Sequence, residues 1–96
     1  MYKDLDPLLH SQLRLTIVSM LMSNEEVDFN TIKDTTQATS GNISVQIKKL
    51  HEAGYIEVLK SFKNNYQNTS LKITSKGIKA FEDYVESLKQ YIKTDK

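Results

Sequence analysis

The sequence of 96 residues predicts an α+β fold that is mostly α, with a three-helix core, a β-hairpin and a long C-terminal helix in one domain over residues 1–96. Two observations support this prediction. An apolar stripe with helix-capping residues at both ends occupies the middle of the chain, and β-prone segments follow it directly. The last part of the chain repeats apolar residues at alternating spacings of three and four, which is typical of a long amphipathic helix.

The first predicted helix occupies the segment 1–22 and begins within it at Asp6 and Pro7, because an acceptor side chain followed by proline is a common helix start. One apolar stripe runs along this helix, formed by Leu9, Leu13, Ile17, Val18 and Leu21. Three further apolar residues lie off the stripe: Leu8, Leu15 and Met22. A helix that is apolar on more than one side is expected to pack against its own core and against a second surface.

A pair of helices is predicted over residues 28–53. Asp28 is expected to cap the first of them, which carries Phe29 and Ile32 on its apolar side. This helix is poor in strong helix formers, so tertiary packing must stabilise it. A tight turn at residues 37–38 then leads into the second helix of the pair.

The second helix of this pair, residues 39–53, has two contrasting faces. Thr39 stands where an N-cap is needed, and Gly54 stands where a left-handed residue ends a helix. The buried stripe is predicted to consist of Ile43, Ile47 and Leu50. The opposite face has mostly short polar side chains and two cations, namely Asn42, Ser44, Val45, Gln46, Lys48 and Lys49. An ordinary solvated face would carry long Glu and Lys pairs, so this composition favours contact with DNA.

Residues 55–74 are predicted to form a β-hairpin. The apolar and β-prone residues of the first strand are Tyr55, Ile56, Val58, Leu59 and Phe62. The second strand is predicted over residues 70–74, where Leu71 and Ile73 alternate with Lys72 and so define one buried face. The intervening residues 63–69 are turn-prone, hydrogen-bonding types and are expected to form a loop.

The C-terminal helix is predicted over residues 75–94. Its apolar positions have the spacing of a heptad seam and are Ile78, Phe81, Val85, Leu88 and Ile92. Tyr84 and Tyr91 widen one side of this seam. The helix can pack back over the first helix of its own chain, or it can meet the same seam of a second copy across a two-fold axis. The dimer is the preferred interpretation, because the seam exceeds what one helix of a small domain usually covers.

The net charge of +1 conceals an uneven distribution along the chain. Residues 1–38 contain three basic and six acidic residues, residues 39–79 contain seven basic and two acidic, and residues 80–96 contain three basic and four acidic. A basic middle third between acidic flanks indicates a surface for a polyanion. A chance cluster of solubilising lysines would give the same counts, and charge alone does not separate the two explanations.

Several classes of chemistry find no support in the sequence. The absence of cysteine excludes disulfides and thiolate metal sites, and it suits a reducing cytoplasm. His10 and His51 lie in different predicted helices with no carboxylate cluster at metal-ligand spacing, and the three glycines are too far apart for a phosphate loop. No apolar stretch approaches the roughly 18 residues of a membrane span, and the first residues lack a signal-peptide pattern. We therefore expect a cytoplasmic protein without catalytic residues, metal or cofactor.

Three helices, two strands and a last helix, with a short turn between the second and third helices, are the order of a winged helix-turn-helix. The sequence itself resembles the small one-domain winged-helix regulators related to the MarR and ArsR groups. The segments that support the resemblance are residues 5–15, 29–33, 39–56 and 71–77. The resemblance implies a dimeric bacterial or archaeal transcription factor that binds a pseudo-palindromic operator and pairs through its first and last helices. It also implies a crevice for a small-molecule effector, although no residue identifies a ligand and a constitutive regulator is equally consistent.

Each residue on the exposed face of the 39–53 helix has an expected role on DNA. Thr39 and Ser40 can bind a phosphate with hydroxyls and helix-end amides, and Ser44 matches the small polar position of the family at the groove. Asn42 and Gln46 lie on one side of the helix, and each can pair bidentately with adenine. The remaining residues are expected to touch a thymine methyl group, in the case of Val45, or the backbone, in the case of Lys48 and Lys49.

The hairpin is the predicted wing, and its tip departs from the family pattern. Related proteins usually carry arginine at the tip, which suits insertion into the minor groove. Here the expected DNA-binding residues of the tip are Lys63, Asn64, Asn65 and Tyr66. With no arginine at the tip, affinity is expected to be modest per protomer and salt-sensitive through a few contacts, which makes dimerisation more necessary.

The proposed dimer interface combines the first and last helices and comprises Leu8, Leu15, Phe81, Tyr84, Val85, Leu88, Tyr91 and Ile92. A different class of function also fits the same fold, because winged helices can serve as protein-interaction modules without sequence-specific DNA binding. The near-neutral charge and the arginine-free wing favour this alternative. The short side chains on the 42–49 face oppose it, since protein-docking faces more often expose aromatic residues or leucine.

Overall fold

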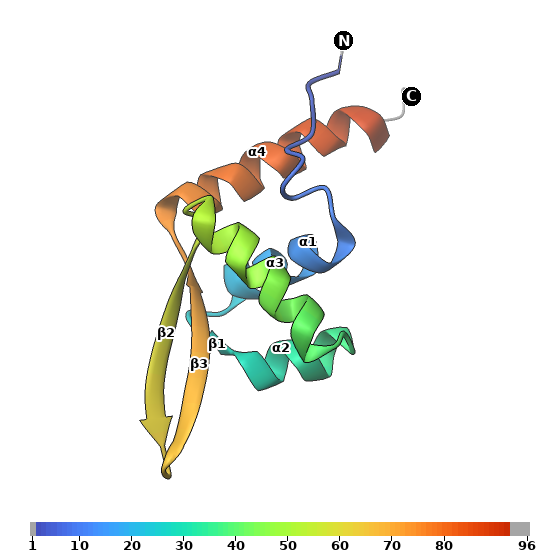
Figure 1. The fold of residues 1–96 in the computed structure, drawn as a ribbon. Coiled ribbons are helices and arrows are strands. Elements are labelled where there is room, and N and C mark those ends of the chain that lie inside the picture. Colours follow the sequence, from blue (N-terminus) through green and yellow to red (C-terminus); the bar gives the residue numbers. More distant parts are fainter. Residues whose placement is uncertain (1, 93–96) are drawn as a thin grey trace.

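The computed structural model describes residues 2–92, which form four helices and a three-stranded antiparallel sheet. The elements are α1 (Gln12–Ser23), β1 (Val27–Asp28), α2 (Phe29–Thr36), α3 (Ser40–Glu52), β2 (Ile56–Lys63), β3 (Tyr66–Ile73) and α4 (Ser75–Ile92). The β2–β3 hairpin projects beside the helices, and α4 crosses the opposite end of the molecule (Figure 1). This order confirms the predicted mostly helical winged arrangement.

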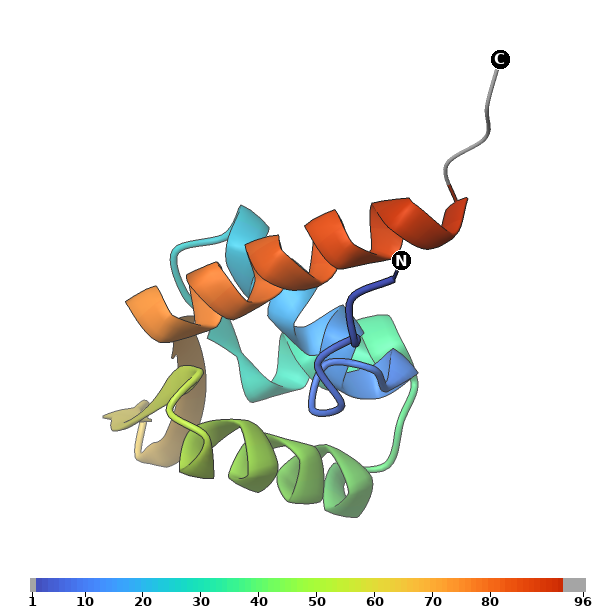
Figure 2. The ribbon, with the colours of Figure 1, turned by 90° about the horizontal axis from the view of Figure 1, so that it is seen from above.

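The core lies around α1, which contacts α2, α3, α4 and β3. Figure 2 shows α1 between α4 on one side and α3 on the other. The predicted stripes of three helices meet there and are buried, namely Ile17, Val18, Leu21, Ile32, Ile43, Ile47 and Leu50. Ile56 and Leu71 of the sheet complete this core. Removal of these side chains from water is the main term that stabilises the domain, and it fixes which face of α3 remains outside.

The predicted start of the first helix at Asp6 is wrong. The N–H groups of Leu9 and His10 donate to the Asp6 carbonyl oxygen (3.1 and 2.9 Å), which makes a single turn, and the Asp6 carboxylate accepts from the N–H of Leu8. The helix itself begins at Gln12, where the Ser11 hydroxyl accepts from the N–H of Arg14. A second capping residue downstream thus takes the role that the sequence pattern assigned to Asp6, because the Ser11 backbone is extended and interrupts the turn.

Two capping hydrogen bonds and two left-handed residues set the geometry of the α2–α3 pair, and the caps at Asp28 and Thr39 are those that the sequence predicted. The Asp28 carboxylate accepts from the N–H of Thr31 (2.7 Å), and the Thr39 hydroxyl accepts from the N–H of Asn42 (3.1 Å). The chain reverses between the helices at Gln37, whose φ of 59° lies in the left-handed region. Gly54, with a φ of 81°, follows α3 and turns the chain into β2.

The hairpin has longer strands and a shorter turn than predicted. The strand order is β1-β3-β2, and the register pairs Ile56 with Ile73 and extends to Lys63 paired with Tyr66. Asn64 and Asn65 alone connect the strands, with φ of 55° and 67°. A two-residue hairpin turn of this type needs two left-handed residues, and asparagine tolerates that conformation best after glycine. The predicted 63–69 loop is therefore wrong, because its hydrogen-bonding residues pair in the ladder.

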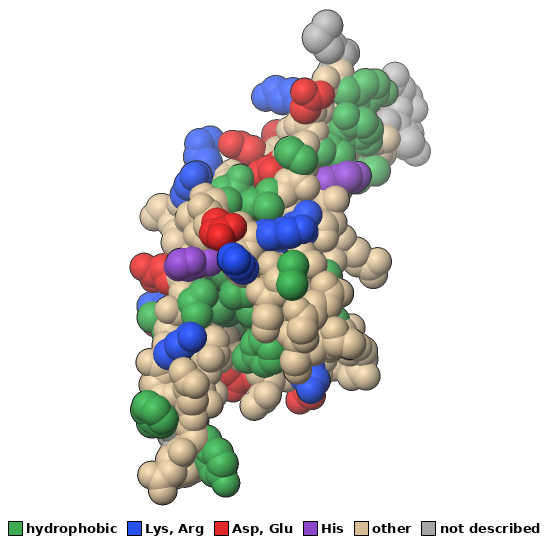
Figure 3. Space-filling view, in the orientation of Figure 1, with side chains coloured by type: hydrophobic (Ala, Val, Ile, Leu, Met, Phe, Trp, Pro, Cys, Tyr) green, Lys and Arg blue, Asp and Glu red, His purple; other side chains and the backbone are tan. Residues whose placement is uncertain are grey.

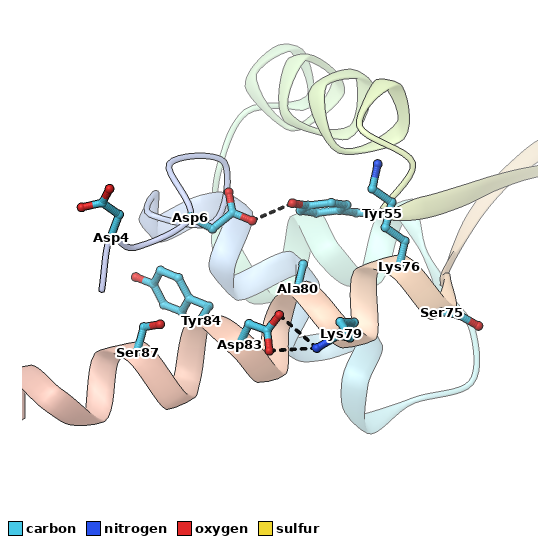
Figure 4. Close-up of a pocket in the computed structure, with 10 residues that line it drawn as sticks. All are labelled: Asp4, Asp6, Tyr55, Ser75, Lys76, Lys79, Ala80, Asp83, Tyr84 and Ser87. Atoms are coloured by element: carbon cyan, nitrogen blue, oxygen red, sulfur yellow. Dashed lines mark hydrogen bonds and ion pairs between the residues drawn. The ribbon is translucent and has the colours of Figure 1, made fainter. Parts of the chain in front are cut away.

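The segment that precedes α1 fastens α4 to the rest of the molecule. On α4, His10 Nδ1 and the Tyr84 hydroxyl share a hydrogen bond (3.1 Å), the Lys3 backbone bonds to Gln90 and Tyr91, and the rings of Tyr2 and Tyr91 lie 4.8 Å apart. Between α3 and β2, the Tyr55 hydroxyl donates to Asp6 (2.6 Å). A cavity of about 610 Å³ opens beside these contacts (Figure 4). It is lined from the N-terminal segment, Tyr55 and α4. The C-terminal part of α4 therefore packs on this segment.

The Tyr55→Phe variant tests this fastening. Burial, followed by the hydrogen bond to Asp6 and the negative charge of Asp6, raises the pKa of Tyr55 from 10.0 to about 12. The neutral phenol is favoured by folding, so its contribution is complete below pH 10 and is lost as the pH rises through about 12. The variant should lower the free energy of unfolding by about 1 kcal/mol at neutral pH. Urea unfolding should show this difference shrinking above pH 10, and a difference independent of pH would contradict the assignment.

Candidate nucleic-acid interface

The outer face of α3 is exposed along its whole length. The buried stripe of α3 points toward α1, so the opposite side chains face solvent, namely Thr39, Ser40, Asn42, Ser44, Val45, Lys48 and Lys49. Gln46 is partly buried at the edge of this face. Figure 3 views the molecule from the side on which α3 lies in front, and Lys and Arg side chains appear over the middle of this face and toward the wing.

The N-terminal turn of α3 is open to a partner. Thr39 caps the helix, as predicted, and no atom lies within 4 Å of a side chain built at Gly41. The first amides of α3 and the hydroxyls of Thr39 and Ser40 therefore share an uncrowded surface. A helix N-terminus with its partial positive charge and free N–H groups is suited to a phosphate group.

Arg14 is a residue of this interface that the sequence analysis missed. It belongs to α1, yet its Nη1 donates to Oε1 of Gln46 on α3 (2.5 Å), and its Nε donates to the carbonyl oxygen of Leu8 (2.6 Å). Gln46 Nε2 in turn donates to Oδ1 of Asn42 (2.8 Å). The two amides expected to pair separately with adenine are thus bonded to each other in the free protein. No local pattern could reveal Arg14, because its partner lies 32 positions away in the sequence.

A groove separates α3 from the wing. It has a volume of about 660 Å³ and is lined by Phe29, Ser44, Ile47, Lys48, His51, Val58, Lys60 and Thr69. Its floor is apolar, and three of its rim residues are Lys or His. His51 and Lys60 were not predicted as site residues. Side chains alternate between the two faces of a strand, so Lys60 lies on the same face of β2 as Val58, toward α3. This alternation could have indicated Lys60 as a site residue.

The wing ends in exposed aromatic and amide side chains. Phe62 is 80% exposed and Tyr66 is 77% exposed, and both flank the Asn64–Asn65 turn. Phe62 pairs with Gln67 in the register, and Tyr66 pairs with Lys63, so the two aromatic rings lie on opposite faces of the ribbon. The sequence has no Asp or Glu between Glu57 and Glu82. The side chain of Lys63 lies outside the described part of the structure.

The candidate dimer residues fall into two groups. Tyr84 is only 5% exposed and shares its hydroxyl with His10, so it belongs to the core of the protomer and its place in the interface is withdrawn. Four others are partly buried against the same core: Leu8, Leu15, Phe81 and Leu88. An outer stripe of α4 remains, with Ile78, Val85 and Ile92 seven residues apart. Tyr91 is 49% exposed but packs on Tyr2 of its own chain. Residues 93 and 94 of the predicted helix lie outside the described residues.

Within residues 2–92, no group of three or more His, Asp and Glu side chains is arranged to bind a metal ion. None of the helices over the same residues combines the length and apolar character needed to cross a bilayer.

A helix-turn-helix whose second helix is exposed beside a β-hairpin wing defines a winged-helix DNA-binding domain. Residues 13–92 match the family model of the winged helix DNA-binding domain, and the chain belongs to this family.

Comparisons with individual proteins agree with this assignment. An uncharacterized protein of Methanocaldococcus jannaschii is 36% identical over 84 residues, which cover 88% of this chain and 91% of the relative. The structure of a transcriptional regulator homologue from Pyrococcus horikoshii OT3 has a TM-score of 0.82 at 26% identity and covers 88% of this chain and 84% of that chain. A mutant of E. coli MarR complexed with operator DNA has a TM-score of 0.72 at 16% identity, covers 90% of this chain and 61% of that chain, and shares the fold.

The chain is therefore a winged-helix DNA-binding protein that shares its fold with MarR. The solved structures that it resembles include a transcriptional regulator homologue from Pyrococcus horikoshii OT3 and the transcriptional regulator BldR from Sulfolobus solfataricus.

Proposed function

We propose that the protein is a sequence-specific transcriptional regulator that binds double-stranded DNA as a homodimer on a pseudo-palindromic operator. The observation that supports this most directly is the outer face of α3, which is exposed and mostly polar, and lies beside a groove rimmed by lysines and a wing that has no acidic residue beyond Glu57 at its base. A helix with such a face fits the major groove, and the wing then lies along the adjacent backbone.

The proposed contacts are of two kinds: contacts to the DNA backbone, which position the protein, and contacts to base edges, which recognise the sequence. Thr39 and Ser40 would bind a phosphate at the start of α3, and Lys48 and Lys49 would bind the backbone farther along. Asn42, Ser44 and Val45 would face base edges. The wing would add Lys60 and Lys63, the amides of Asn64 and Asn65, and the ring of Tyr66. Few cations per protomer take part, so binding should depend on salt through a correspondingly small number of released counterions.

A second copy would double this interface. The outer stripe of α4, Ile78, Val85 and Ile92, lies away from the core, and Ile92 is 69% exposed. Leu8, Leu15, Phe81, Leu88 and Tyr91 would border it. Burial of these side chains against the same surface of a second copy gives a closed two-fold dimer. Such a dimer can place two α3 helices in successive major grooves about one helical turn apart.

A small-molecule effector would have room in the cavity between α4 and the winged core (Figure 4). The cavity mixes carboxylates (Asp4, Asp6, Asp83) with lysines (Lys76, Lys79) and two tyrosines. A regulator that acts without an effector is equally compatible with this lining.

The second candidate is a winged-helix module that binds another protein rather than a DNA sequence. The exposed aromatic rings of Phe62 and Tyr66 favour it, because aromatic residues are enriched in protein interfaces. The lysines and the absence of acidic residues from the wing beyond Glu57 favour DNA instead.

Selection of genomic DNA fragments at about 100 mM salt distinguishes the two candidates, since specific and non-specific binding differ in salt dependence. The wild type should enrich a two-fold symmetric site, and the Lys48→Glu/Lys49→Glu variant should enrich none. Lys3→Glu/Lys79→Glu has the same change in net charge away from α3 and should behave as the wild type. Equal enrichment by wild type and Lys48→Glu/Lys49→Glu would contradict the proposed interface.

A further inference from the structure

Arg14, the only arginine of the chain, lies behind the recognition helix and makes hydrogen bonds to two uncharged groups. Arg14 Nε donates to the carbonyl oxygen of Leu8 (2.6 Å), and Nη1 donates to Oε1 of Gln46 (2.5 Å). None of the ion pairs within the described residues involves Arg14. The Leu8 backbone fixes the guanidinium, so its second hydrogen bond points at one position on α3.

The chemistry of arginine sets the orientation of the next side chain. A guanidinium has five N–H donors and no acceptor, so Gln46 must turn its carbonyl oxygen toward Arg14. The Gln46 NH₂ group then points the other way, and it donates to Oδ1 of Asn42 (2.8 Å). Gln46 thus uses its oxygen and one N–H within the protein, and it is partly buried.

The orientation of the Gln46 amide in turn sets the orientation of the Asn42 amide on the exposed face of α3. Asn42 accepts with its oxygen from Gln46, so its NH₂ group remains to face a partner, and the residue is exposed. A bidentate contact with adenine needs a donor and an acceptor on one amide. In this arrangement the Asn42 oxygen is turned toward Gln46, so the side chain presents its NH₂ donors outward.

We infer that Arg14 is a positioning residue that sets base preference: through Gln46 it presents Asn42 as a hydrogen-bond donor. The acceptors that a donor can meet in the major groove are O6 and N7 of guanine, O4 of thymine and N7 of adenine. Adenine places its N6 donor beside N7, so an outward NH₂ group favours guanine or thymine. This inference rests on the proposed function, and it replaces the expectation that Asn42 and Gln46 each pair with adenine. Arg14 itself does not touch the base in this account.

Selection from random duplexes, read position by position, tests the inference. Asn42→Ala first locates the base pair that this residue reads, as the position whose preference is lost. The wild type should prefer guanine or thymine on the contacted strand there. Arg14→Met frees the Gln46 amide, so this preference should weaken at least several-fold while the other positions keep theirs. A general loss of folding or affinity would not single out one position.

Gln46→Glu gives a second variant with a reversed expectation. Its carboxylate can accept from Arg14 and from the NH₂ group of Asn42, so Asn42 should turn its oxygen outward and prefer the donor groups of cytosine or adenine. Gln90→Glu, the same substitution on α4, is the matched control and should leave the profile unchanged. Adenine at this position for the wild type, or identical profiles for the wild type, Arg14→Met and Gln46→Glu, would overturn the inference while leaving the regulator intact. Recovery of no site by the wild type would instead reject the proposed function and the inference with it.

Discussion

The Gly77→Ala variant should lose about 3 kcal/mol of stability or fail to fold, since overpacking by one methyl group at a rigid site costs about this much. A Cβ atom at Gly77 would lie 2.2 Å from the carbonyl oxygen of Tyr55 and 2.9 Å from Cγ1 of Ile73. The Tyr55 carbonyl cannot easily move, because it accepts from the N–H of Thr74 (3.0 Å) where α4 meets the sheet. Urea unfolding measures the loss, and the clash outweighs the roughly 1 kcal/mol that alanine contributes in a helix.

Gly41→Ala is the matched control for this variant. Gly41 also lies in a helix, but no atom is within 4 Å of its added methyl group. Alanine there should therefore raise the free energy of unfolding by about 0.5–1 kcal/mol through reduced backbone entropy. Equal stability of the two variants would show that the close approach of α4 to Tyr55 is not a constraint.

The Val85→Asp/Ile92→Asp variant should be monomeric and should bind a two-site operator at least about a hundredfold more weakly. Both side chains lie on the outer stripe of α4, where a carboxylate in a symmetric contact would be buried opposite its own copy. Loss of the second subunit removes the advantage of linked binding, which is typically about 10²–10⁴ in affinity. Sedimentation equilibrium gives the mass, and titration of the operator gives the affinity.

Lys79→Asp provides the control for the added negative charge, because Lys79 is exposed on α4 and pairs only with the exposed Asp83 among the ion pairs described. This variant should remain dimeric. A Val85→Asp/Ile92→Asp protein with the mass and the affinity of the wild type would reject the outer stripe as the interface.

The fold was predictable wherever a residue acts on its neighbours in sequence. The stripe of Ile43, Ile47 and Leu50 and the caps at Thr39 and Gly54 are local signals, and the structure confirms them. Where two local signals conflict, the sequence alone does not show which of them the structure follows. Asp6 and Ser11 are both good helix caps, and residues 67–69 suit a turn as well as a strand.

The site was less predictable, because its arrangement depends on distant residues. Nothing near Arg14 in sequence indicates that it reaches Gln46, and this contact changes what Asn42 can offer to DNA. The heptad spacing likewise indicated that α4 has apolar residues for two contacts. It did not show which of these residues pack against the rest of their own chain. The hydrogen bond between Tyr84 and His10 decides that question, and the two residues lie 74 positions apart in the sequence.

The most direct test of the account is an NMR titration of the ¹⁵N-labelled protein with an operator-length duplex at low salt. The account predicts that the amide signals of Thr39–Lys49 and of the wing shift or broaden, that the outer stripe of α4 changes little, and that added salt reverses the effect. Shifts confined to α4, or a spectrum unchanged by the duplex, would contradict the assignment of α3 and the wing as the DNA interface.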